Sequence, residues 1–268
     1  MLTAEKIQSN WDEFLGYIST HISSPRKEAL IQFYTDREER FVLMPASYKP
    51  QYHSCFPGGY IDHVNRVIKS SLLSYDMWEK MGADMTTFTK EELVFAAINH
   101  DLGKFGSDEE ACYIEQTDTW RKDKLGEQYT FNTKIEFMSV PDRSLYLLME
   151  NNIPFSKNEM LAIKLHDGIY DEANKPYLVS WTPEQKPRSS IVYILHHADM
   201  MATRIEFETE WLPKFKNGEN TKSKMSTTIS TSTSNPIAKV RKTKEEIKTK
   251  ALSSLIDNNN VLNNFFKQ

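Results

Sequence analysis

The chain has 268 residues, of which 39% are hydrophobic and 12% aromatic, enough for one substantial domain with accessory segments or for two small domains. Its formal net charge of −4 excludes a global basic field that would attract nucleic acid. The two cysteines, Cys55 and Cys112, are too few for a disulfide scaffold and fit a reducing cytoplasm. No stretch has the length of a membrane span, and residues 1–11 lack the apolar run of a signal peptide. We therefore expect a soluble, cytoplasmic protein that does not bind membranes.

The pattern of apolar residues predicts an all-α protein. Ser24 and Pro25 have the pattern of an N-cap followed by proline at the first helical position, which would begin a helix running towards Arg40. An irregular stretch, Pro45–Gly59, follows and ends in a Pro-Gly-Gly turn. A longer helix is then expected from Tyr60 to Met81. Its apolar residues recur at helical spacing, at Ile61, Val64, Ile68 and Leu72.

Two further helices are expected to begin with a capping box and to end in a His-Asp pair. Thr89–Glu92 has the capping-box pattern and starts an apolar segment that leads into His100-Asp101, with Gly103 as the C-terminal cap. Ser156–Glu159 repeats the pattern and leads into His166-Asp167-Gly168. Each of the two helices is therefore expected to end in a His-Asp pair that lies close to a glycine.

Composition divides the chain into four parts. Residues 1–43 predict an N-terminal helical extension. Residues 44–212 predict the domain that carries the chemistry, with a last helix that begins at Thr182-Pro183 and includes Ile191–Ile205. Residues 213–242 are rich in Ser, Thr, Lys and Asn and predict a flexible linker, because they bury too little apolar surface to offset the entropy of ordering. Residues 243–268 begin with a capping box and predict a C-terminal amphipathic helix.

Histidines and aspartates on separate predicted helices indicate a metal site. A lone histidine in a helix is usually structural, but a carboxylate directly after a buried apolar segment is costly unless it is paired or bound to a metal. Three such placements occur, and neutral imidazoles together with carboxylates suit divalent first-row metals. The residues concerned are His63, His100, Asp101, His166, Asp167 and Asp199.

Three segments resemble the HD-domain metal-dependent phosphohydrolases, in particular the branch that contains bacterial 3′–5′ exoribonucleases. They are residues 52–63, residues 96–104 with the sequence Ala-Ala-Ile-Asn-His-Asp-Leu-Gly-Lys, and residues 195–199 with the sequence Leu-His-His-Ala-Asp. The resemblance covers residues 44–207 and implies that the domain predicted at residues 44–212 is an HD-domain helical bundle. It also implies a primary metal site whose ligands are His63, His100, Asp101 and Asp199.

The chain departs from the family pattern at two places that bear on the number of metal ions. His166 matches the first histidine of the His-His-Gly motif of two-metal members, but Asp167 stands at the second position. No histidine lies between Asp101 and His166, where Asp142 is the nearest substitute. We therefore expect one divalent ion (Mn, Mg, Co, Ni, Fe or Zn) rather than two, although Asp167 leaves room for a second, harder cation such as Mg²⁺ or Mn²⁺.

The resemblance also assigns roles beyond the primary ligands. Asp101 would bridge metal and water and orient the attacking water. Lys104 would neutralise a phosphate oxygen, although a solvated lysine at a helix end is an equal alternative. Further candidates for substrate contact are His53 beside the Pro-Gly-Gly turn, Arg66 (for which an internal ion pair is the stronger expectation), His196 near Asp199, and Tyr170 and Tyr177, which could stack a nucleobase.

The expected function is hydrolysis of a phosphoester, in a nucleotide or cyclic nucleotide, by a metal-activated water. The expected partner is thus a small phosphorylated substrate. Three alternatives stay open: a 3′–5′ exonuclease-like activity on RNA or DNA, a di-iron HD oxygenase, and a non-catalytic HD module for binding or regulation. Oligomerisation through the terminal helices also stays open.

Overall fold

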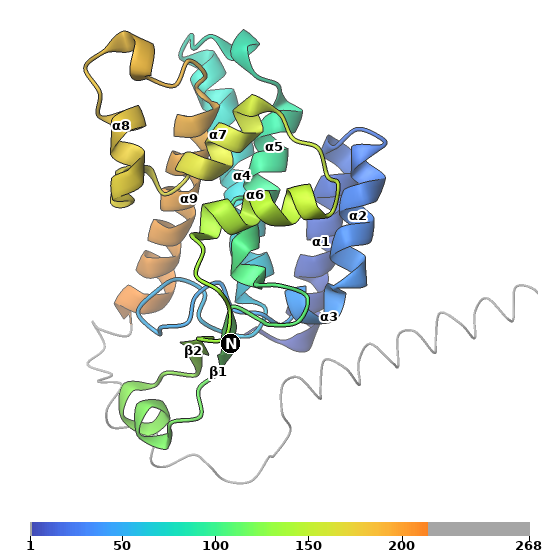
Figure 1. Ribbon diagram of the computed structural model, residues 1–268, viewed down its shortest axis with the longest axis vertical. Coiled ribbons are helices and arrows are strands. Elements are labelled where there is room, and N and C mark those ends of the chain that lie inside the picture. The colour runs from blue at the N-terminus through green and yellow to red at the C-terminus, as the bar shows by residue number, and fades with distance from the viewer. Residues whose placement is uncertain (1, 214–268) are drawn as a thin grey trace, which may run out of the picture.

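The computed structural model describes residues 2–213, which are predominantly helical, as the sequence predicts (Figure 1). The predicted linker beyond Pro213 and the predicted C-terminal helix at 243–268 lie outside the described residues. Within the described part of the chain, no helix is both long and apolar enough to cross a membrane.

The first 43 residues form three helices: α1 (Ala4–His21), α2 (Arg26–Asp36) and α3 (Glu38–Phe41). The predicted cap at Ser24 is wrong. Pro25 takes the N-cap position without a side-chain bond, while the Ser24 hydroxyl donates to Glu28. The helix predicted to reach Arg40 is interrupted at Arg37. Helix α1 buries Trp11, Phe14 and Ile18 in the same hydrophobic core as the central helices, so the predicted extension is packed into the domain.

The central helices begin as the sequence predicts. Helix α4 (Gly59–Lys80) starts after Gly58, whose φ of +83° is accessible to glycine without strain. Helix α5 (Lys90–Asn99) has the expected capping box between Thr89 and Glu92. Every residue from Leu93 to Asn99 is buried, and a helix that is apolar on all sides belongs at the centre of a core.

Gly103 does not cap α5, contrary to the prediction. His100 is the C-cap residue, and Gly103 lies within a 3₁₀ turn, η2 (Leu102–Phe105). Its role is close approach to α6 (Val140–Glu150), because a Cβ at this position would lie 2.2 Å from the carbonyl oxygen of Val140. The glycine therefore sets how closely α6 can pack beside the His100-Asp101 turn.

Helix α7 (Lys157–Leu165) begins with the expected capping box at Ser156 and ends at His166. The start predicted for the last helix, at Thr182-Pro183, is wrong. The Pro183–Gln185 segment is a separate 3₁₀ turn (η6), and α9 (Ile191–Glu206) begins at Ile191. Shorter helical segments complete the described chain: η1 (Met85–Thr87), η4 (Gly168–Tyr170), η5 (Glu172–Asn174), α8 (Lys175–Leu178) and the π-helical η7 (Phe207–Trp211).

The structure contains a small β-hairpin that the sequence did not predict. Strands β1 (Tyr113–Glu115) and β2 (Tyr129–Phe131) pair in antiparallel register, with Tyr113 opposite Phe131. A π-helical turn, η3 (Arg121–Leu125), lies between the two strands, and the hairpin sits at the end of the helical bundle (Figure 1). Three-residue strands are too short to give a readable alternation of apolar and polar residues, which is why the pattern missed them.

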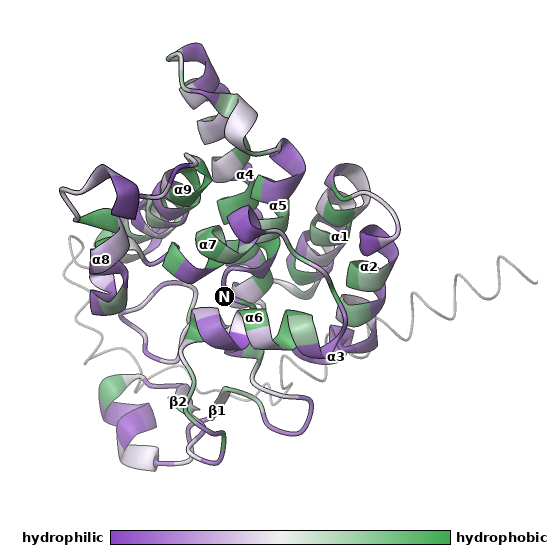
Figure 2. Ribbon diagram, turned by 45° about the horizontal axis from the view of Figure 1, so that its top comes forward, coloured by the Kyte–Doolittle hydropathy of each residue, from purple (hydrophilic) through white to green (hydrophobic). Residues whose placement is uncertain are grey.

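The helices pack around α5, which contacts α1, α4, α7 and α9. Hydrophobic residues concentrate on α5 and α7 at the centre of the molecule, and hydrophilic residues on the outlying segments (Figure 2). Arg26 on α2 links the starts of two of these helices, because its guanidinium lies 2.6 Å from Glu91 and 2.8 Å from Glu159. The same guanidinium covers the ring of Phe95 at 4.2 Å.

Replacing Gly103 with alanine tests the close approach of α6. The added methyl group would clash with backbone, so we expect Gly103→Ala to lower the free energy of unfolding by about 1–3 kcal/mol. Gly16→Ala in α1 is the matched control, because no atom lies within 4 Å of its added Cβ. That control should gain about 0.5–1 kcal/mol from helix propensity. Urea unfolding measures both, and equal stabilities of the two variants would contradict the packing described here.

Candidate metal centre

Four helices bring imidazoles and carboxylates together in the core. His63 lies on α4, Asp199 on α9, His100 and Asp101 at the end of α5, and His166 at the end of α7. The Nε2 atom of His63 is 3.2 Å from Oδ1 of Asp199 and 3.5 Å from Oδ2 of Asp101. It is also 3.4 Å from Nε2 of His100. Three of these residues, His63, His100 and Asp199, have ligand atoms close enough to share one cation.

Local helix geometry orients two of the histidines in the same way. Nδ1 of His100 bonds the carbonyl oxygen of Ala97 at 2.8 Å, and Nδ1 of His166 bonds that of Ile163 at the same distance. A carbonyl oxygen only accepts, so in each ring Nδ1 carries the proton and donates. Nε2 is the nitrogen that faces the cluster, and it can offer a lone pair to a metal ion when the ring is neutral. A backbone carbonyl on the outer nitrogen is the usual support of a metal-binding histidine.

The Asp101 carboxylate is the centre of the cluster. Its Oδ2 accepts from Lys104 Nζ at 2.5 Å and lies 3.4 Å from Nε2 of His100, while its Oδ1 lies 3.6 Å from Nε2 of His166. Burial alone would raise the pKa of Asp101, but Lys104 and His100 hold it well below its usual range. The carboxylate is therefore ionised. Its Oδ2 faces His100, and its Oδ1 faces His166.

The donor set fits a divalent cation. Oδ1 of Asp199 is buried and has no hydrogen-bond partner among the described residues. Burial by itself lowers the pKa of His63, but the nearby carboxylates of Asp101 and Asp199 outweigh it and raise that pKa to about 9. The pKa of His166 also rises to about 9, against the effect of burial, through Asp101 and Asp167. The cluster thus attracts positive charge, which a divalent ion would supply to nitrogen and carboxylate ligands.

A pocket of about 840 Å³ opens on one side of the cluster. His166 and Asp199 reach its wall from the metal cluster, and His53 and Lys104 line it beside them. Tyr48 faces Tyr113 of the hairpin at a ring distance of 5.6 Å and Tyr52 at 6.3 Å. These three tyrosines all line the pocket, so it has an aromatic wall, and Lys104 lines it as well.

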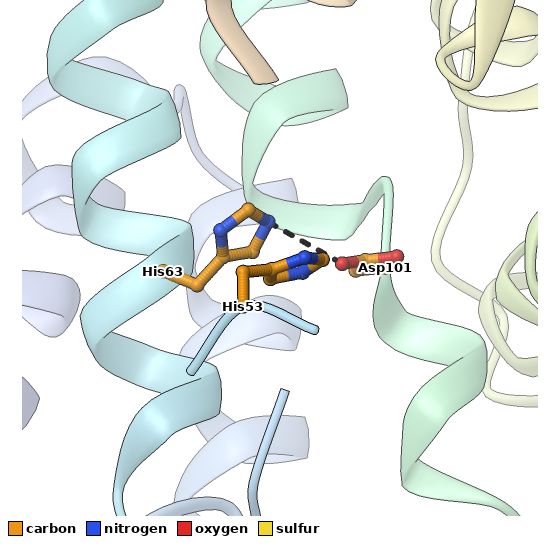
Figure 3. Close-up of side chains that lie close together, drawn as sticks. All are labelled: His53, His63 and Asp101. Carbon is orange, nitrogen blue, oxygen red and sulfur yellow. Dashed lines mark ion pairs between the residues drawn. The ribbon is translucent and has the colours of Figure 1, made fainter. Parts of the chain in front are cut away.

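His53 lies deeper in the site than the sequence suggested. Its ring centroid lies 4.4 Å from that of His63, with the two planes tilted by 35°, and Figure 3 shows both rings beside Asp101. His53, His63 and Asp101 also form a group that could hold a metal ion. Burial, followed by the nearby His63 and Lys104, holds the pKa of His53 well below its usual value. A neutral imidazole can accept from Lys104, whose Nζ lies 3.4 Å from its Nε2.

Other predicted residues differ in how close they lie to the cluster. Asp167 is half-exposed with Oδ1 3.7 Å from Nε2 of His166, and it lines the pocket. Tyr170 also lines the pocket, and its ring lies 6.2 Å from that of His196. Nδ1 of His196 bonds the carbonyl oxygen of His166 at 2.8 Å. A Cβ on Gly168 would lie 2.2 Å from the His196 ring, so the glycine makes room for this contact.

Three candidates lie outside the site. Arg66 forms the expected internal ion pair, with Asp62 at 2.9 Å and Glu210 at 3.1 Å, and does not line the pocket. Tyr177 lines a separate cavity of about 480 Å³. Asp142 does not replace the missing histidine, since it pairs with Lys164 at the surface. The substrate contacts predicted for Arg66 and Tyr177 are therefore not supported by their positions.

Comparisons with protein-family models, with curated proteins and with solved structures give no match.

Metal binding should stabilise the folded chain. A ligand that binds only the folded state adds about 2.7 kcal/mol at a concentration one hundred times its dissociation constant. We expect Mn²⁺ to raise the unfolding temperature of the wild type and to have little effect on Asp199→Asn. Asp142→Asn is the control and should respond like the wild type, because its carboxylate lies outside the cluster. Thermal unfolding with and without Mn²⁺ measures this. An equal response of all three proteins would rule out Asp199 as a ligand.

Proposed function

We propose that this chain is an HD-type helical bundle that hydrolyses a phosphoester with the help of a bound divalent metal ion. One observation carries the proposal. Nitrogen and carboxylate ligands from four helices meet at the inner end of a pocket, where a lysine ammonium, Lys104, also lies. Residues 96–104 and 195–199, which resemble the HD signature, contain three of these ligands: His100, Asp101 and Asp199.

His63, His100, Asp101 and Asp199 would hold the ion. When bound, a divalent ion lowers the pKa of a water molecule and polarises a phosphoryl oxygen. One ion is favoured, because Nε2 of His63 lies within 3.5 Å of ligand atoms of Asp199, His100 and Asp101. The other oxygen of Asp101, with His166 and Asp167, leaves a place for a second one.

The chain's own groups supply the rest of the chemistry. The ionised Asp101 carboxylate is held at the inner end of the pocket and can orient the attacking water or accept its proton. Burial would lower the pKa of Lys104, but Asp101 raises it above its usual value, so the ammonium stays charged. A fixed positive charge beside the reacting phosphate stabilises the negative charge that grows in the transition state.

The pocket suits a small substrate with a ring and few phosphates. Among the described residues that line it, the cations are Lys104 and Arg204 and the acids are Asp167, Asp199 and Glu206. A polynucleotide chain would need a longer run of cations to neutralise its phosphates. The three wall tyrosines can stack a nucleobase. We therefore place a nucleotide or cyclic nucleotide ahead of RNA or DNA as substrate.

A di-iron oxygenase is the second candidate, because the site holds more histidine than the sequence suggested. The gap between Asp101 and His166 argued against a full ligand set, yet His53 lies beside Asp101 from another part of the chain. Metal analysis separates the two functions. Tightly bound iron with the absorption spectrum of an oxidised iron centre would favour the oxygenase over the phosphohydrolase.

Hydrolysis is tested with a panel of nucleoside mono- and triphosphates, cyclic dinucleotides and short oligonucleotides in Mn²⁺, Mg²⁺, Co²⁺ or Ni²⁺. We expect His100→Ala and Asp101→Ala to abolish activity, because each removes a metal ligand. Lys104→Met should lower kcat by about 10²–10³-fold, the usual cost of one electrostatic donor. Asp142→Asn is the control for each metal. If wild type, His100→Ala and Asp101→Ala release phosphate or cleave phosphodiesters at the same rate, the phosphohydrolase proposal fails.

The aromatic wall gives a second prediction. Stacking of a base on an aromatic side chain contributes about 1–3 kcal/mol, so Tyr48→Leu should weaken nucleotide binding by roughly 5- to 150-fold. Hydrolysis of glycerol phosphate, which has no ring, should change little. Tyr177→Leu serves as the control, since Tyr177 lines a different cavity. An equal loss for glycerol phosphate and nucleotides would show that Tyr48 does not stack a base.

A further inference from the structure

A buried glutamate at the end of α9 has no part in the metal cluster. Glu206 is 2% exposed, and its carboxylate accepts two bonds from one residue, the backbone N–H and the hydroxyl of Ser54. The hydroxyl bond is 2.7 Å long. Ser54 and Glu206 are 152 residues apart in sequence, so these bonds fasten the loop before α4 to the last long helix.

Ser54 is held in an unusual backbone conformation. Its φ of +47° lies in the left-handed region, which a residue with a Cβ adopts at a cost. Its carbonyl oxygen accepts from the N–H groups of Ala46 and Phe56, each at 3.0 Å. The hydroxyl of Ser47 donates to the carbonyl oxygen of His53 at 2.8 Å. The backbone on both sides of the His53 side chain is therefore tied in place.

This tied backbone sets where the His53 ring lies. The ring lies 4.4 Å from the ring of His63, and its Nε2 lies 3.4 Å from Nζ of Lys104. The Lys104 ammonium in turn donates to Asp101 at 2.5 Å. An ammonium has three N–H donors, so a third remains for a group in the pocket that both residues line.

We propose that Glu206 is a positioning residue, which holds His53 through Ser54 so that His53 and Lys104 together form the anion-binding end of the pocket. The role of that end rests on the proposed function. The position of the His53 ring does not, because it follows from the bonds to Ser54. Asp199 lies seven residues before Glu206 on the same helix and on the same face, so α9 places both a metal ligand and the anion-binding end.

The positioning step can be tested without any substrate. The chain has seven histidines, and their ring nitrogens can be followed individually by ¹H–¹⁵N NMR. We expect the His53 ring signals to shift and broaden in Glu206→Ala, while Glu206→Gln keeps them, because its carboxamide can still accept from the Ser54 N–H. Glu150→Ala is the control, since Glu150 accepts a hydrogen bond from Tyr146 at the surface of α6. His53 signals in Glu206→Ala identical to those of the wild type would overturn the proposal.

A double-mutant cycle tests whether Glu206 acts through His53. For a nucleotide substrate, His53→Ala and Glu206→Ala should each lower kcat/KM by about tenfold, the lower end of what loss of a supporting partner costs. The double variant should fall no further than His53→Ala alone, and Glu206→Gln should recover most of the loss. Additive losses, or an unchanged kcat/KM in His53→Ala, would overturn the proposal.

The two measurements also separate this proposal from the hydrolase assignment. If no phosphoester is hydrolysed, the cycle is run on the binding of inorganic phosphate in the presence of Mn²⁺, measured by calorimetry. Should Glu206→Ala fold poorly, Ser54→Ala takes its place, because it removes the hydroxyl bond and keeps the backbone. The His53 signals of Ser54→Ala should then shift from their positions in the wild type, and no shift at all would overturn the proposal.

Discussion

The charge on Asp101 has to be compensated inside the protein, and much of the architecture follows from this requirement. A carboxylate this deeply buried is costly unless positive or hydrogen-donating groups surround it. His100 and Lys104 come from the same turn as the carboxylate, whereas His63 and His166 come from α4 and α7. Helices that would otherwise pack through apolar contacts alone are thereby required to meet at one polar point.

The metal cluster and the pocket are built in different ways. The cluster residues sit on or directly after long helices whose positions the core determines. One side of the pocket wall comes from the loop at residues 46–53, from Tyr113 of the hairpin and from Tyr170 after α7, and another side comes from α9. Rigid helices can hold reactive groups to within a fraction of an ångström, while loops can vary in length and composition with little effect on the core. The loop side of the pocket can therefore change while the arrangement of the His/Asp cluster is kept.

The sequence predicts those parts of the fold and site that depend on local rules. Both capping boxes are read directly from residues three apart, and the apolar segment that ends in His100-Asp101 locates the central helix correctly. Long-range contacts leave no such pattern. Glu206 meets Ser54, and His53 meets Lys104, only because the helices pack as they do.

Gly103 illustrates the same limit. As a glycine after a helix it has the pattern of a C-cap, but its function depends on the carbonyl oxygen of Val140. That close approach is visible only once α6 is in place. Tyr170 and Tyr177 show how a local pattern can mislead. Seven residues apart in one segment, they read as a pair, yet they line different cavities.

The two helices that end in a His-Asp pair are also joined where they begin. The hydroxyl of Ser156, which caps α7, donates to Glu92 in the capping box of α5 at 2.5 Å. From these joined starts, helices of ten and nine residues lead to His100 and His166. Each residue of an α-helix advances the chain by about 1.5 Å and turns it by about 100°. The number of residues between cap and histidine therefore sets the position and direction of each imidazole. Side chains in between can be exchanged for others of similar volume, but one residue inserted or removed would turn an imidazole away from its partners.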